Sequence, residues 1–261
     1  MKKYCILGTD NRSVKLRQIY KDIGKDIVSY DLADIIVAPI PFSRDDIKVN
    51  GEIVECNDLI ENLKCNNKVL FSGAISLNMK EKLKKENIKY YDLLELEEVS
   101  ILNAIPTAEG AIATAMEITD FTLSGSNIIV LGYGKIGKIL SKMLSGIGAN
   151  VYCEARKAKD ISMIRAMGYK WVKLEDLDNV ISNMDVVFNT IPSVILDEKK
   201  LKLLKKSCSI IDLASPPGGV DFLTAKELGI NAVWALSLPS KIAPYSAATY
   251  IKEAIDNIIK E

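Results

Sequence analysis

Histidine is missing from this sequence, since none occurs among the 261 residues. Mechanisms that need an imidazole base, a Ser-His pair or a histidine metal ligand are therefore excluded. Any proton transfer at a catalytic site has to use another group.

Cysteine is scarce and shows no pattern. The five cysteines are odd in number, scattered, and include no C-x-x-C pair. This argues against a disulfide framework and against a zinc site, so no metal is expected. Such usage is typical of a protein of the reducing cytoplasm.

An excess of either charge is also absent, as is any long apolar run. Thirty-four basic residues balance thirty-four acidic ones, so no net field attracts nucleic acid or an anionic membrane. The first letters, MKKYCILGTDNR, contain only a very short apolar segment, so neither export nor membrane insertion is indicated. We expect a cytoplasmic protein with a small-molecule substrate.

What the sequence does contain is a regular alternation of short apolar runs and amphipathic segments. In the first hundred residues the apolar runs begin at Tyr4, Asp34, Lys68 and Ile88. This alternation is typical of a parallel sheet flanked by helices. We predict an N-terminal α/β substrate domain over 1–105.

The most informative motif is a glycine-rich turn within NIIVLGYGKIGKILSKML. An apolar run at 128–131 precedes the glycines, and apolar residues at helical spacing follow them. A strand-to-helix turn without side chains lets backbone N–H groups and the helix N-terminus approach a pyrophosphate. The spacing alone also fits an ordinary structural turn, but this context favours a dinucleotide site. The predicted cofactor-binding residues of the turn are Gly132, Tyr133, Gly134, Lys135, Ile136 and Gly137.

Strands and helices continue to alternate after the glycine turn. We predict strands at ANVYCEARK, KWVK, MDVVFNTIP, SIIDLAS and NAVWALSLP, with helices between them. A helix with a capping candidate at Thr107, ending near Asp120, links the two domains. The predicted fold class is therefore α/β with two α/β domains and the cleft between them, the C-terminal one a Rossmann doubly wound parallel sheet within 106–243. The amphipathic tail at 244–261 is expected to pack back on the first domain.

The end of the second strand of the nucleotide domain selects the cofactor, because it meets the adenosine ribose. The letters there are Glu154-Ala155-Arg156-Lys157. The usual acid position falls at Ala155, and Arg156 and Lys157 follow where a 2′-phosphate would lie. We predict NADP in preference to NAD. A solvated basic loop is one alternative, and ribose binding by Glu154, if the strand is offset by one residue, is another.

Two further turns follow apolar strands and are expected beside the cofactor. FNTIP contains Thr190, Ile191 and Pro192, and Thr190 is a candidate donor to a cofactor ribose. IDLASPPGG contains Leu213, and its paired prolines and glycines would form a rigid wall near the nicotinamide. Ordinary structural turns explain both motifs as well.

Charged residues that could bind the substrate occur in two other motifs. ALSLPSKIAPYSAA places Lys241 after the last strand, where it can bind a carboxylate or accept a proton. GTDNR places Asp10 and Arg12 after the first strand, where Arg12 can clamp a carboxylate. A solvated lysine, and a helix N-cap followed by an exposed arginine, are the alternative interpretations.

Taken in order, these motifs resemble those of the dipicolinate synthase A-subunit family over most of the chain. The resemblance is carried by ILGTDNR, NAIPTAEGAI, IIVLGYGKIG, the ARK after the second strand, FNTIP, IIDLASPPGG and LPSKIAPYSAA. Thr9 and Glu154 depart from the family, which usually has a glycine and a small residue there.

The resemblance implies NADP-linked oxidation of dihydrodipicolinate, or of its hydroxylated tetrahydro precursor after loss of water, to dipicolinate. Aromatisation is strongly downhill, so positioning and carboxylate binding can supply most of the rate without histidine. It also implies the mother cell of a sporulating bacterium, a homo-oligomer, and a partner in the form of a second, flavoprotein-like subunit. The implied substrate-binding residues are Arg12, Arg44 and Lys241, and the implied catalytic residues are Lys241, Asp10 and Thr107.

Two other functions fit the same letters. One is an NAD(P)-dependent oxidoreductase acting on another cyclic imine, amino acid or hydroxy acid. The other is a non-catalytic nucleotide-binding subunit. Hydride transfer in the presence of substrate would distinguish this last function from both enzymes.

Overall fold

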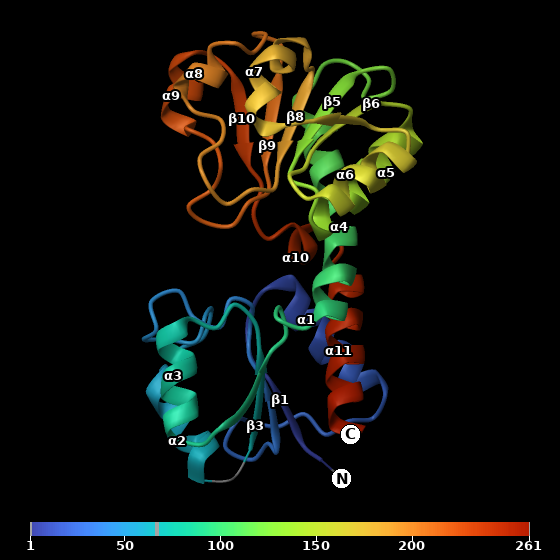
Figure 1. Cartoon of the computed structure of the whole chain (residues 1–261). Coiled ribbons are helices and arrows are strands. Elements are labelled where there is room, and N and C mark those ends of the chain that lie inside the picture. The colour runs from blue at the N-terminus through green and yellow to red at the C-terminus, as the bar shows by residue number, and fades with distance from the viewer. Residues whose placement is uncertain (1, 66–67, 261) are drawn as a thin grey trace. The chain divides into compact units, whose positions relative to one another are not determined.

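The protein has an α/β fold with two parallel sheets, seen in a computed structural model that describes residues 2–65 and 68–260 (Figure 1). The chain divides into two compact units. The first unit comprises Met1–Asn103 and Pro239–Glu261, and the second comprises Ala104–Leu238. The predicted α/β class is thereby confirmed.

The first unit is built on a parallel sheet in the order β1-β2-β3-β4. Its strands coincide with the predicted apolar runs and are β1 (Tyr4–Ile6), β2 (Ile35–Val37), β3 (Val69–Ser72) and β4 (Lys89–Asp92). Its helices include α1 (Asn11–Asp22), α2 (Cys56–Cys65), α3 (Leu77–Lys85) and α11 (Pro244–Lys260). Successive strand residues face opposite sides, so Ile36 packs toward α2 and α3 whereas Ile35 packs toward α1 and α11.

The second unit has a parallel sheet in the order β10-β9-β8-β5-β6-β7. Its strands are β5 (Asn127–Leu131), β6 (Asn150–Glu154), β7 (Lys170–Val172), β8 (Val186–Asn189), β9 (Ser209–Asp212) and β10 (Asn231–Trp234). The chain order of these strands across the sheet is the doubly wound Rossmann order that the sequence predicts. Ligands of such sheets bind outside the carboxyl ends of the strands, beside β5 and β8, where the order reverses.

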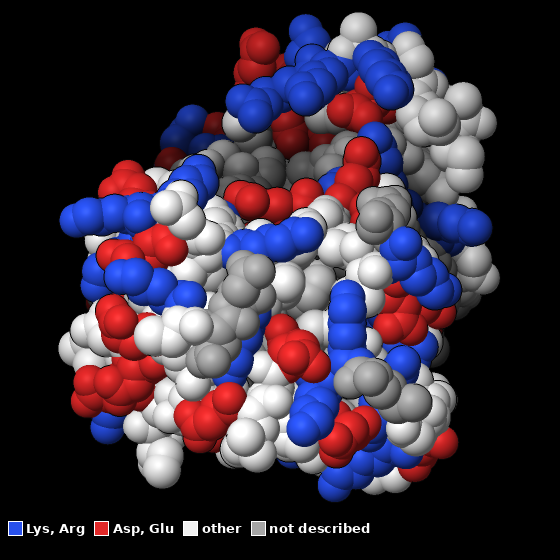
Figure 2. Space-filling view, turned by 90° about the horizontal axis from the view of Figure 1, so that it is seen from below, with Lys and Arg blue, Asp and Glu red and all other residues white. Residues whose placement is uncertain are grey.

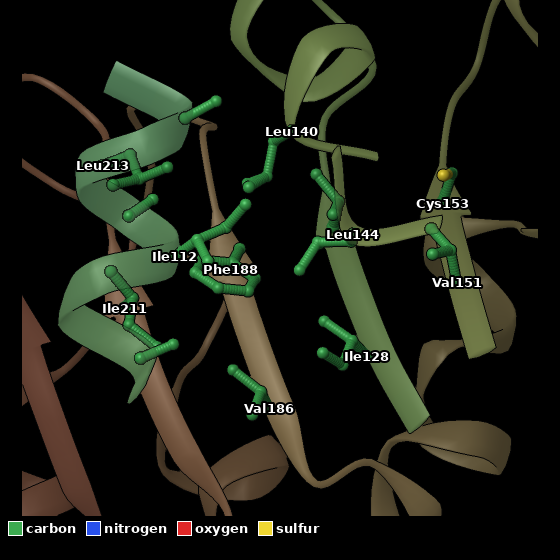
Figure 3. Close-up of a cluster of buried hydrophobic side chains, with 14 of the residues drawn as sticks. Ile112, Ile128, Leu140, Leu144, Val151, Cys153, Val186, Phe188, Ile211 and Leu213 are labelled. Atoms are coloured by element: carbon green, nitrogen blue, oxygen red, sulfur yellow. The ribbon is translucent and has the colours of Figure 1, made fainter. Parts of the chain in front are cut away.

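Helices cover both faces of this sheet. One face carries α4 (Glu97–Ile118), α5 (Lys135–Ile147) and α6 (Ala158–Ala166). The other carries α7 (Leu177–Val180), α8 (Glu198–Leu201) and α9 (Phe222–Glu227), with short 3-10 turns at Leu174–Asp176 and Ile181–Asn183. Figure 3 shows the core on the face covered by α4, α5 and α6, called the α5 core below. In it, Ile128, Val186 and Phe188 of adjacent strands meet Leu140 and Leu144 of α5.

The linking helix differs from the prediction at its start. Helix α4 begins at Glu97 and contains Pro106, so Thr107 lies inside the helix and is not its cap. A proline removes one backbone hydrogen bond and disfavours helix. Burial of Ala104, Ala108 and Ala111 along the same helix offsets this local cost.

Several features of the described ranges, 2–65 and 68–260, bear on function. No helix there is both long and apolar enough to cross a membrane. No cluster of acidic and cysteine side chains there is arranged to hold a metal ion, and the cysteines are free thiols. On the face seen in Figure 2, basic and acidic side chains are intermixed.

Candidate functional site

The glycine turn at the end of β5 forms a cradle for an anion. Gly132 has φ of +90°, which side chains disfavour, so a glycine is required there. Gly134 is the N-cap of α5 and, having no side chain, makes no side-chain cap at the start of this 13-residue helix. A Cβ at Gly134 would meet nothing within 4 Å, so this side of the turn has space for a ligand. The turn therefore fits the pyrophosphate of a dinucleotide.

Two contacts hold the turn in place from behind. A Cβ at Gly137 would clash with the Gly132 carbonyl oxygen, so the third glycine allows α5 to pack directly on the turn. The Thr190 hydroxyl donates to the carbonyl of Leu131 at 2.9 Å. Thr190, predicted as a donor to a cofactor ribose, thus uses its proton on the main chain at the end of β5.

The other residues of the turn contribute differently. Tyr133 is buried in the α5 core, and this burial raises its pKa to about 12. Because the side chains of Tyr133 and Ile136 pack in this core, these two residues are placed to offer backbone atoms to a ligand. Lys135 begins α5 and is exposed.

A second part of the site lies at the end of β6. Glu154 is the last residue of that strand and is only 3% exposed. Burial raises the pKa of its carboxyl, against the opposing effects of the Gly132 backbone N–H and of the Arg156 charge. Its Oε1 atom has no hydrogen-bond partner among the described residues. Strand β6 thus ends at Glu154, one residue before Ala155, where counting along the sequence placed the acid that binds the ribose.

A cavity of about 690 Å³ opens beside this strand end. Its walls come from the residues after β6, from the end of β7 and from the segments after β8, which places it where the adenosine half of a dinucleotide binds in this fold. Apolar side chains supply one part of the lining, namely Ile161, Trp171, Leu174, Val194 and Ile195. Arg156, Lys173 and Lys200 supply positive charge, and Glu175 is also present. The combination suits a flat base with a phosphate nearby.

The sequence motifs did not identify two of these cations. Lys173 and Lys200 belong to no recognisable motif, although Lys173 is the last residue of the predicted strand KWVK and so falls at the carboxyl edge of the sheet. Lys157, in contrast, was predicted at the cofactor, and its backbone forms the N-cap of α6 while its side chain is exposed.

A buried polar network shapes the wall formed by FNTIP and IDLASPPGG. Asp212, at the end of β9, accepts hydrogen bonds from the Asn189 side chain at 2.8 Å, from Ala214 N at 3.0 Å and from Gly219 N at 2.8 Å. Asn189 also binds both the N–H and the carbonyl of Ile191. These bonds fix the two loops to each other at the carboxyl edge.

The remaining predicted residues of this wall have mixed positions. Ile191 is half-buried and packs against Gly132, Pro192 is exposed, and Leu213 is buried in the α5 core.

In the first unit, Asp10 and Arg12 lie together and serve the start of α1. Asp10 is the N-cap and accepts from the backbone N–H groups of Arg12 and Ser13. Arg12 is 7% exposed, and its guanidinium donates to the Ile40 carbonyl at 2.9 Å. Burial opposes ionisation of Asp10, but hydrogen bonds from Ser13 and Ser240 and the charge of Arg12 lower its pKa below the ordinary value.

The bond from Ser240 to Asp10, at 2.9 Å, brings a second motif to the same place. Ser240 and Lys241 belong to the short helix α10 (Leu238–Ile242), and Lys241 is exposed. Arg44 is exposed in a separate loop, and Thr107 is half-buried in α4. The structure thus joins Asp10, Arg12 and the segment of Lys241.

The raised pKa of Glu154 gives a stability prediction. The folded state holds this proton more tightly than the unfolded state, so the stabilising contribution is present below pH 4.5 and is lost as the pH rises through the higher folded-state pKa. Glu154→Gln removes this dependence. We expect the unfolding free energy of the unmodified chain minus that of the variant to fall as the pH rises from about 4 toward 7. Urea denaturation without cofactor at a series of pH values measures it. A difference that is flat or rises with pH would contradict the assignment.

The strand order, the glycine turn and the adjoining cavity together define a Rossmann-type dinucleotide-binding domain of the kind found in dehydrogenases. Residues 105–216 match the family described as D-isomer specific 2-hydroxyacid dehydrogenase, NAD binding domain. The chain is thus related to nicotinamide-dependent oxidoreductases.

Comparison with individual proteins gives the family. The A-subunit of dipicolinate synthase from Bacillus subtilis (strain 168) is 31% identical over 241 residues, which are 90% of this chain and 81% of that protein. The crystal structure of the dipicolinate synthase A-subunit from Bacillus halodurans superposes with a TM-score of 0.90 at 28% identity, covering 100% of this chain and 98% of that one. The crystal structure of the corresponding chain of the Bacillus subtilis synthase gives 0.89 at 27% identity, covering 99% and 96%. The chain belongs to the dipicolinate synthase A-subunit family, as its motifs suggested.

Proposed function

We propose that this chain is the dehydrogenase subunit of a dipicolinate synthase and that it uses NADP. It would oxidise dihydrodipicolinate, or the hydroxylated tetrahydro precursor after loss of water, to dipicolinate. The observation that carries the cofactor part is the cavity beside β6, where Arg156, Lys173 and Lys200 surround an apolar pocket next to the glycine turn. The relatives named above support the substrate part.

The residues present fit a bound dinucleotide. The uncapped N-terminus of α5 and the free side of Gly134 suit the pyrophosphate. The apolar walls suit adenine, and the guanidinium of Arg156 suits a 2′-phosphate. When bound, the cofactor would accept a hydride, so the protein itself has to bind, orient and shield the substrate.

Substrate binding in this proposal falls to cations, because dipicolinate precursors carry two carboxylates. Lys241 and Arg44 are exposed and would bind carboxylates, and Lys241 would also receive a proton. One guanidinium nitrogen of Arg12 donates to the Ile40 carbonyl, and its remaining N–H groups would bind a substrate carboxylate. Asp10 acts as a positioning residue, because it holds Ser240 next to Lys241. The Thr107 hydroxyl would assist in binding the substrate.

The cellular setting follows from the same proposal. The enzyme would work in the cytoplasm of the mother cell of a sporulating bacterium, as a homo-oligomer and with a second subunit of the flavoprotein-like kind.

A coupled absorbance assay tests the function. Purified chain is mixed with NADP and enzymatically generated tetrahydrodipicolinate precursor, and the absorbances of reduced nicotinamide and of the pyridine product are followed together. We expect both signals to rise in parallel, with NADP giving the faster rate than NAD. The same mixture is repeated in the presence of the second subunit. Silence with either cofactor in both mixtures would reject this substrate and favour another cyclic imine or a non-catalytic role.

A further inference from the structure

A groove with an apolar lining lies between helices α5 and α6 of the second unit and has a volume of about 230 Å³. Of its ring side chains, Tyr133 and Tyr169 are buried, whereas Met163 and Met167, about one turn apart along α6 and its C-cap, are exposed. Methionine side chains are flexible and polarisable, so an exposed pair of them adapts to an incoming apolar group. The groove, called the α5–α6 groove below, therefore suits an apolar side chain from outside.

Lysines surround the α5–α6 groove. Lys138 and Lys142 come from α5 and Lys159 comes from α6, and all three are exposed. Lys138 pairs with Asp160 across the two helices at 2.8 Å. Neither Lys142 nor Lys159 forms an ion pair within the part of the chain that the structure describes. The groove thus has an excess of positive charge, and an apolar side chain accompanied by carboxylates matches it.

The first unit of the same chain carries such a group. Ile53 is 91% exposed, the highest value among the large apolar side chains that the structure describes. Glu52 and Glu55 stand on either side of it in the sequence, and Glu55 is exposed. The surrounding segment, 43–58, contains five acidic and two basic residues, so it has an excess of negative charge.

The backbone around Ile53 is held in one shape. An antiparallel bridge joins Lys48 and Glu55 on either side of it, so 48–55 forms a hairpin. The Glu52 carboxylate accepts from the Gly8 N–H at 2.6 Å, which ties this hairpin to the segment after β1. A single exposed apolar residue is common and needs no function. A preorganised one beside a carboxylate loses little conformational entropy on binding, which favours its use as an anchor.

We propose that the 48–55 hairpin of one copy of the chain docks in the α5–α6 groove of a second copy. Ile53 enters the apolar groove, and the Glu55 carboxylate faces Lys142 and Lys159. The two surfaces differ, so the contact is heterologous: after one contact a hairpin and a groove are still free, and copies add head to tail until a ring closes or a chain grows. The inference gives a surface to the homo-oligomer of the proposed function and rests on no assignment of cofactor or substrate.

Sedimentation velocity on the full chain, without cofactor or substrate, tests the contact. Concentrations up to about 100 µM are used, because a small interface gives weak association. Ile53→Ala removes the anchor, and Met163→Glu places a carboxylate in the groove. Both side chains are exposed, so the variants keep their fold, which circular dichroism checks. Leu223→Ala is the matched control, because Leu223 is 78% exposed but lies outside the hairpin and the groove.

We expect the unmodified chain and Leu223→Ala to associate equally as the concentration rises. Ile53→Ala and Met163→Glu should each weaken the association constant about thirtyfold or more, as loss of a central interface residue does. The decisive sample is an equal mixture of these two variants. It retains one intact contact, between the hairpin of Met163→Glu and the groove of Ile53→Ala, so dimers and no larger species are expected.

The outcomes separate this inference from the catalytic part of the proposed function. A monomeric unmodified chain would overturn the inference and the homo-oligomer with it, but would leave the dehydrogenase untouched. Unchanged association in either variant, or a mixture that behaves as the sum of its two components, would overturn the inference and point to another interface. Silence in the coupled absorbance assay would reject the proposed reaction and leave this contact as it is.

Discussion

Gly137→Ala is expected to abolish measurable cofactor binding and to destabilise the second unit by about 3 kcal/mol. A Cβ at this position would clash with the carbonyl oxygen of Gly132, a backbone atom that cannot move unless the turn opens. Opening the turn displaces the N–H groups that face the pyrophosphate. Urea denaturation gives the stability, and calorimetric titration with NADP gives the binding.

Two glycines of the same region serve as controls for Gly137. Gly146→Ala lies in the same helix, where an added Cβ would meet nothing within 4 Å, so it should preserve binding and stabilise by up to about 1 kcal/mol. Gly134→Ala has equal room in the unliganded protein. It should cost no more than about 1 kcal/mol of stability, because alanine is a poorer N-cap than glycine, and it should weaken cofactor binding, because the methyl group enters the space of the pyrophosphate. If Gly137→Ala behaved like Gly146→Ala, the assigned role of the turn would be wrong.

Arg156→Ala is expected to weaken NADP binding by about a hundredfold and NAD binding by less than about threefold. Only NADP carries the 2′-phosphate that this guanidinium can bind in a fork, so only NADP loses a charge-assisted pair. Calorimetric titration with each cofactor measures the two changes.

The control for Arg156 is Lys142→Ala, which removes one exposed positive charge from the same unit but outside the adenosine cavity. It should alter both affinities little and equally. Equal losses of affinity for NADP and NAD in Arg156→Ala would mean that this arginine is an ordinary solvent-exposed residue that does not bind the 2′-phosphate. The main support for NADP would then be gone.

The end of β6 explains why the choice of cofactor was hard to predict from the sequence alone. Counting from the start of the strand placed the ribose-binding position at Ala155, with Arg156 after it. The structure ends β6 at Glu154 and buries that carboxyl next to Gly132. Where a strand ends depends on its pairing with the neighbouring strands, which local sequence does not specify.

Most of the fold could be predicted from local sequence patterns. The apolar runs of both sheets were found because strands buried on two faces read as continuous hydrophobic segments. The glycine turn was found because a strand, three glycines and a helix are adjacent in the chain. The start of helix α4 was predicted wrongly at Thr107, because a proline is a strong local signal against helix. Tertiary burial of the alanines on either side of Pro106 overrides that signal.

The sequence by itself determined the class of this protein: two sets of strand and helix alternation, a dinucleotide turn at Gly132, and a mechanism without histidine. These features depend on periodicity and on residues that are neighbours in the chain. Only the tertiary structure decided that Thr190 supports the turn, that Asp10 caps α1, and that Lys173 and Lys200 share a cavity with Arg156. Such roles depend on which strand ends lie next to each other, because parallel strands bring residues from distant parts of the chain to one edge of a sheet.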